Sequence, residues 1–208
     1  MLIPFRLSCT LFTASLLLAA TANIVSLNTP AKDPIAALHL CIEQRFQART
    51  SFGMSRVLPD RSHGILRFEP ENATEQKVVT ELQNQGYQVA LFLVGRYALD
   101  APSGKGDLSR FGLQGPAFMT AEPKDLPDSA ELLSTGRKAL LAFASSDVYD
   151  VRQGAWMVAM RPLRATNLAC VSCHATGLAN KIQDAEHRSA IGDALGVAMY
   201  VYRTSATR

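Results

Sequence analysis

Two stretches in the first half of the chain repeat apolar residues at intervals of three and four, the period of a helix with one buried face. The first runs from Pro34 to about Arg49, and its apolar stripe is Ile35, Leu38, Ile42 and Phe46. The second begins at Asn72, where Glu75 three residues later completes a capping signature, and Gly86 ends it. Two helices are therefore predicted before the middle of the chain.

A third helix is predicted from Asp128, again with a glutamate, Glu131, three residues on. Its apolar face consists of Leu132, Leu133, Leu140 and Leu141. The stretches 50–71 and 100–127 lack a clean period and carry several Gly and Pro residues. Both are expected to be mostly irregular, the second as a functional or covering loop.

Runs rich in Val, Leu, Met and aromatic residues predict strands. They are 87–97, 148–151, 155–163 and 195–202, with a turn at Gly154 between the second and third. Helices come first and strands dominate the end of the chain. This order predicts an α+β fold in which helices pack against an antiparallel sheet.

Composition agrees with one globular domain and limits its partners. The chain has 208 residues, 48% hydrophobic and 19% charged, with a net charge of +3. This is long enough for a sizeable core. No run of Lys or Arg forms a basic patch, so nucleic acid is not expected as a partner.

The N-terminus differs from the rest. Arg6 precedes an apolar stretch, and Ala20-Thr21-Ala22 supplies the small-x-small pattern of a cleavage site. We expect residues 1–22 to be a signal peptide and residues 23–208 to be a single exported, periplasmic domain. The alternative is a retained anchor, but the stretch is shorter than the roughly 20 apolar residues of a span. No membrane span is expected after cleavage.

The cysteine count is odd once the signal is removed. Cys41, Cys170 and Cys173 remain, and a disulfide framework in an oxidising compartment usually needs an even number. If two of the three attach a cofactor, Cys41 is left as a buried, reactive or ligating thiol.

Cys170-Val171-Ser172-Cys173-His174 is the attachment sequence of c-type haem. Two thiols separated by two residues form thioethers with the vinyl groups of the porphyrin, and the adjacent histidine then binds the iron. The sequence predicts one covalent haem c held by Cys170 and Cys173, with His174 as the proximal ligand. It would lie between the last two strands.

Two other uses of a Cys-x-x-Cys pair compete with haem attachment. A thioredoxin-like thiol pair needs a βαβ unit around it, which this chain lacks. A zinc site would need a fourth ligand, and adjacent Cys173 and His174 cannot easily share one tetrahedron.

The strands beside the motif are expected to line the haem. The candidate lining residues are Trp156, Met157, Val158, Met160, Val197, Met199 and Val201. Arg161 and Arg164 could pair with the propionates, although solvation at the surface is the more ordinary fate for either.

The second axial position has several candidates. Met199 lies inside a strand, unlike the loop methionine of small cytochromes c, and His187 lies in a polar segment. His39 and Cys41 lie on the first helix, about 55° and about 105° from the centre of its apolar stripe. Periodicity mildly favours His39, whereas the unpaired thiol of Cys41 is a strong ligand for ferric iron.

Together these residues resemble a known family, the periplasmic c-type haem domains with a PAS-like fold. The similarity rests on Arg161-Pro162-Leu163, the haem motif, Gly192-Asp193 and Gly196-Val197-Ala198, and on a helix that carries Cys41. It covers residues 155–202 and the helix around Cys41. The resemblance implies a PAS-like antiparallel sheet and a low-spin haem ligated by His174 and Cys41.

Two functions follow as expectations. One is redox or small-ligand sensing, with a diatomic gas as ligand and a separate signalling protein as partner. The other is one-electron transfer to a redox partner protein. A peroxidase-type enzyme would need distal acid-base residues, for which His63 and His39 are the imidazoles at hand, and it is the less favoured alternative.

Overall fold

The computed structural model describes residues 33–48, 57, 66–96, 99, 113–171 and 189–204. Residues Ala31–Arg208 form one compact unit. The predicted signal peptide, Cys173, His174, His63 and His187 lie outside the described residues. Within the ranges given, no helix has the length and apolar character needed to cross a bilayer.

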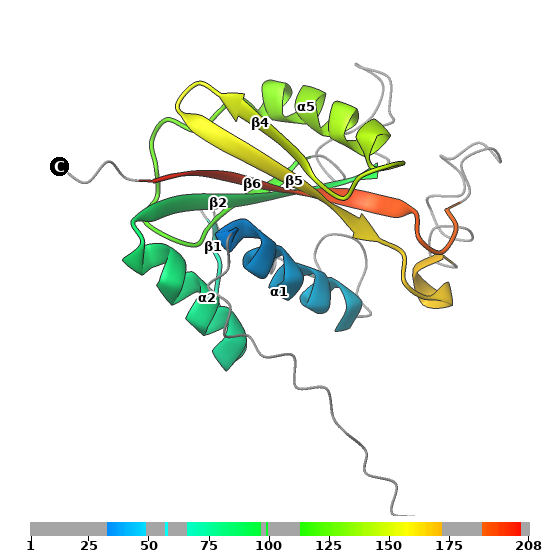
Figure 1. Cartoon of the computed structure of the whole chain (residues 1–208), viewed down its shortest axis with the longest axis horizontal. Helices are drawn as coiled ribbons and strands as arrows, with labels where there is room; N and C mark the ends of the chain where they lie inside the picture. The colour runs from blue at the N-terminus through cyan, green and yellow to red at the C-terminus, as the bar shows by residue number, and fades with distance from the viewer. Residues whose placement is uncertain are drawn as a thin grey trace, which may run out of the picture. The chain divides into compact units, whose positions relative to one another are not determined.

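A single six-stranded sheet forms the centre of this unit (Figure 1). The strand order is β1-β3-β2-β6-β5-β4, and every pairing is antiparallel except the short parallel contact of β1 with β3. The strands are β1 (Leu66–Arg67), β2 (Tyr87–Gly95), β3 (Gln114–Phe118), β4 (Tyr149–Gln153), β5 (Trp156–Arg164) and β6 (Ala194–Thr204). The last strand thus lies in the middle, between β2 and β5.

The described helices cover both faces of the sheet. Helices α1 (Pro34–Ala48) and α2 (Ala73–Asn84) lie on one face, and α5 (Ser129–Ala142) lies on the other (Figure 1). Both predicted capping residues are confirmed. The Asn72 side chain accepts from the backbone N–H of Glu75, and Asp128 does so for Ala130 and Glu131.

Two apolar clusters fill the layers. The stripe of α1 packs into a cluster with inward-facing strand residues such as Leu91, Leu163, Ala198 and Tyr200. Leu132 and Ala139 of α5, together with Phe143 at its C-cap, join a second cluster with Met160, Val197, Met199 and Val201. Alternate residues of β5 and β6 face opposite layers, as the period of a strand requires. The predicted α+β class with an antiparallel sheet is confirmed.

Two strands were missed by the sequence reading. β3 lies within 100–127 and β1 within 50–71, both expected to be mostly irregular. β3 contains Gly115 and Pro116, which are rare inside strands, and Gly115 has a φ of +117°. A Cβ at this glycine would lie 2.5 Å from the carbonyl oxygen of Leu91, so the close approach of β2 requires glycine there.

Candidate haem-attachment site

Cys170 lies in a helical turn that follows β5. The turn covers residues 168–171, and its first free N–H groups are capped by Asn167. The Asn167 Oδ1 atom accepts from the backbone N–H of Cys170 at 3.1 Å, and the Asn167 carbonyl accepts from Val171 at 3.4 Å. The sequence pattern had predicted a loop for the motif, but its first two residues, Cys170 and Val171, lie in this helical turn.

The two strand ends that flank the motif are tied together. The N–H of Ala165 donates to the Asp193 carbonyl at 2.9 Å, and the N–H of Gly192 donates to the Ala165 carbonyl at 2.8 Å. The two ends of the segment that contains the motif are therefore hydrogen-bonded to each other where β5 ends and β6 begins.

The Cys170 thiol is unpaired and 3% exposed. It belongs to the apolar cluster on the α1 face, together with Leu163, Ala165 and Leu195. The C-terminal end of α1 lies beside this turn, because Gln47 donates to the Arg164 carbonyl at 3.1 Å and hydrogen-bonds Thr166. A free thiol in apolar surroundings at the start of a helix suits one thioether of haem c.

Most of the strand residues predicted to line the haem lie on the opposite face of the sheet from Cys170. Trp156, Val158, Met160, Val197, Met199 and Val201 all belong to the cluster under α5, across the sheet from Cys170. Met199 Cε occupies the place that a Cβ at Gly136 of α5 would need. Met199 therefore fills the α5 layer and is not a candidate ligand. The buried residues of β5 and β6 that share the cluster of Cys170 are Ala159, Leu163, Leu195, Ala198 and Tyr200.

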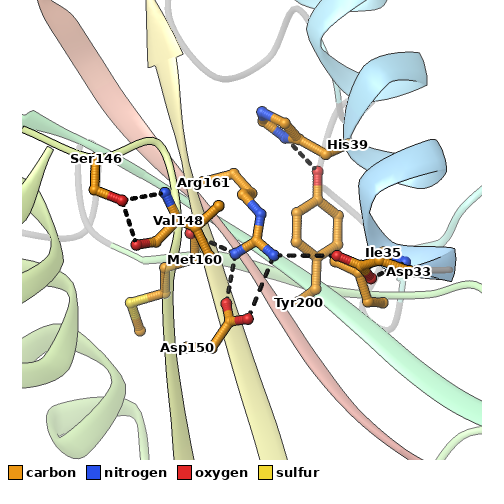
Figure 2. Close-up of polar contacts among 9 residues, drawn as sticks. All are labelled: Asp33, Ile35, His39, Ser146, Val148, Asp150, Met160, Arg161 and Tyr200. Carbon is orange, nitrogen blue, oxygen red and sulfur yellow. Dashed lines mark hydrogen bonds and ion pairs between the residues drawn. The ribbon is translucent and has the colours of Figure 1, made fainter.

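Both arginines considered for the propionates have protein partners. Arg161 is 5% exposed and pairs with Asp150 at 2.5 Å and with Asp33 at 3.5 Å (Figure 2). Arg164 pairs with Asp147 at 2.5 Å and donates to the Phe143 and Gly192 carbonyls. Arg161 thus anchors the start of α1 to β5 and β4.

His39 on α1 points at the sheet and meets Tyr200 of β6 (Figure 2). Its Nδ1 lies 2.9 Å from the Tyr200 hydroxyl, and the rings pack edge to face at 5.9 Å. Burial, and then the Arg161 guanidinium, lowers the pKa of His39 to about 4. Burial also raises the pKa of Tyr200 well above its ordinary value. At neutral pH the pair is an uncharged imidazole and a protonated phenol.

The hydrogen-bond pattern determines the tautomer of His39. Tyr200 is fully buried, and within the described ranges Nδ1 of His39 is the hydrogen-bond partner of its hydroxyl. A buried hydroxyl that donates to nothing costs about 1–3 kcal/mol. The hydroxyl therefore donates to Nδ1, and the imidazole carries its proton on Nε2. Neither nitrogen then has a free lone pair for iron, which disfavours His39 as a ligand.

Cys41 lies on the other flank of α1. It lies two positions after His39 in the chain, which is about 200° around the helix, so one iron atom cannot use both. Cys41 is 3% exposed and lies one turn before Arg45, which contacts α2. Burial, and then the Glu75 carboxylate, raises the pKa of its thiol. The thiol of Cys41 is not part of a disulfide.

Within the described part of the chain, no three His, Cys, Asp or Glu side chains form a group that could hold a metal ion. The proximal candidate His174 is not among these residues. No protein-family model, no curated protein and no solved structure matches the chain.

Sequence reasoning missed Tyr200, Asn167 and the Arg45–Glu75 pair. Asn167 carried a local signal, since asparagine three residues before Cys170 is a cap pattern. The other contacts join residues far apart in the chain and had no such signal.

Proposed function

We propose that the chain is an exported, periplasmic protein with one haem c, attached through Cys170 and Cys173 and ligated by His174. The observation that carries the proposal is the setting of the motif. Its first cysteine has a free, buried thiol and lies on a capped helical turn. This turn follows the point where backbone hydrogen bonds join the end of β5 to the start of β6. Haem c would supply a one-electron couple and, where an axial position is open, a site for a diatomic gas.

Cys41 is the proposed second axial ligand. The tautomer of His39 argues against its rival, and Cys41 is a buried thiol without a disulfide partner. An antiparallel sheet whose last strand lies centrally, with helices on both faces, supports the PAS-like assignment.

Sensing is the favoured mode, with electron transfer as the second. The proposed ligand lies on α1, a helix fixed to the rest of the unit by separate polar contacts at Arg161, Tyr200 and Glu75. Displacement of the ligand would change how α1 packs at these contacts, and a separate signalling protein would detect that change. Electron transfer needs only a fixed haem and a redox partner protein.

Two substitutions test the ligand, and one titration tests the mode. Cys41→Ser should change the visible and EPR spectra of the ferric protein, whereas His39→Gln should leave its low-spin signals in place. Unchanged spectra for Cys41→Ser would remove this residue from the iron. Rapid binding of CO or NO to the reduced protein favours sensing, and the absence of binding favours electron transfer.

A further inference from the structure

Arg45 of α1 and Glu75 of α2 form a buried ion pair between the two helices. Arg45 is 6% exposed and Glu75 is 3% exposed. The Nε of Arg45 donates to Glu75 Oε1 at 2.6 Å, and a terminal nitrogen of Arg45 donates to Oε2. The guanidinium fork thus matches both carboxylate oxygens, the strongest geometry for such a pair.

Further contacts hold each partner in place. The same terminal nitrogen of Arg45 donates to the Glu69 carbonyl at 2.6 Å, and the guanidinium stacks on Phe68 at 4.2 Å from the ring centre. Glu75 accepts from the backbone N–H of Glu71 at 2.6 Å and donates its own N–H to Asn72. Contacts with the start of α2 and the residues before it therefore hold the pair in place.

Cys41 lies one helical turn before Arg45, on the same flank of α1. After burial, the charges of Glu75 and Arg45 have the largest effects on the pKa of its thiol. A shift of α1 away from α2 would leave two buried charges without partners, which is strongly unfavourable. The pair consequently fixes the position of the helix face that carries Cys41.

We propose that Arg45, paired with Glu75, is the positioning residue for Cys41, and that separation of this pair is what lets Cys41 leave its place and a small ligand enter. This proposal rests on the proposed function, because it takes Cys41 as the axial ligand. It adds that the Arg45–Glu75 contact controls the exchange of Cys41 for a small ligand.

The chain offers a matched control on β6. Arg203 also holds a carboxylate with two nitrogens, Asp125 at 2.6 and 2.9 Å, and also stacks on an aromatic ring, Trp156 at 4.1 Å. This second pair ties β6 to the segment before α5 and touches neither α1 nor α2. Arg203→Lys thus removes similar chemistry at a place that should not affect Cys41.

The experiment compares Arg45→Lys, Glu75→Gln, Arg203→Lys and Cys41→Ser in the full haem-loaded chain. Ferric EPR, the rate of CO binding to the reduced protein and amide exchange of residues 34–48 are measured for each. We expect Arg45→Lys and Glu75→Gln to alter the low-spin EPR signals and to speed CO binding and α1 exchange about tenfold or more, because opening no longer breaks a matched buried pair. Glu75→Gln keeps the shape of the side chain, and it serves if Arg45→Lys does not fold. Arg203→Lys should leave all three readings near wild type.

The outcomes separate this proposal from the proposed function. If Cys41→Ser changes the spectra but Arg45→Lys and Glu75→Gln do not, the positioning role is overturned and the ligand stands. An equal effect of Arg203→Lys would also overturn it, since general destabilisation would then explain the result. If Cys41→Ser leaves the spectra unchanged, the ligand assignment fails first and the positioning role fails with it.

Discussion

Replacing Tyr200 with Phe tests the contact that argues against His39 as an iron ligand. The substitution removes one oxygen from a fully buried ring and leaves Nδ1 of His39 without its partner. No neighbouring group has to move, because phenylalanine keeps the ring shape. The change therefore isolates one hydrogen bond between α1 and β6.

The magnitude follows from the burial of that bond. A typical hydrogen bond contributes about 0.5–1.5 kcal/mol to stability, and an unsatisfied buried partner costs more. His39 is partly buried, so a hydrogen bond from water replaces the lost bond to Nδ1 only in part. We expect the free energy of unfolding to fall by about 1–2 kcal/mol for Tyr200→Phe at pH 7.

Urea unfolding followed by circular dichroism measures this difference, provided that the slope with urea stays constant. Tyr202→Phe is the matched control. It lies two residues further along β6 on the same face, is only half-buried, and should cost less than about 0.5 kcal/mol. ¹⁵N NMR of labelled histidine then reads the tautomer, which should carry the proton on Nε2. Equal stability of Tyr200→Phe and wild type, or a proton on Nδ1, would refute the reasoning and restore His39 as a ligand candidate.

Three further predictions concern other parts of the unit. Burial alone would raise the pKa of Glu75, but the hydrogen bonds from Arg45 and the Glu71 N–H outweigh it and lower that pKa below 4.5. The pair should therefore stabilise the protein above about pH 4.5, and Glu75→Gln should lower the free energy of unfolding by on the order of 3 kcal/mol at pH 7. In urea unfolding, the difference in free energy between wild type and Glu75→Gln should shrink as the pH falls below 4.5. A difference that stays constant with pH would contradict the assignment. Met199→Leu should leave the ferric and ferrous spectra unchanged, because Met199 packs under α5; a loss of low-spin bands would return it to the iron. Asn167→Ala should lower stability by about 1 kcal/mol through loss of the cap on the Cys170 turn, and an unchanged urea midpoint would show that this cap contributes nothing.

Local signals in the sequence predicted much of the fold. Asn72 and Asp128 were recognised as helix starts because a capping side chain acts on N–H groups two or three residues away. The turn at Gly154 was equally local, and the residue has a φ of +59°. β3 was missed because Gly115 and Pro116 are residues that strand patterns rarely contain, and the strand depends on its pairing with β2.

Assignment of strand faces needed the three-dimensional structure. β5 and β6 are buried on both sides, so both faces are apolar and the pattern does not tell which one meets Cys170. The contacts that position α1 are also out of reach of the sequence. His39 and Tyr200 are 161 residues apart, and Arg45 and Glu75 are 30 residues apart.

The intact mass of the purified protein, with its reduced absorbance spectrum, tests the central claim most directly. The chain should be expressed with a signal peptide and the cytochrome c maturation machinery, beside Cys170→Ala as the control. We predict a mass increased by one haem and reduced bands of the c type, both weakened or lost in the variant. A mature protein without a covalent haem under these conditions would contradict the account.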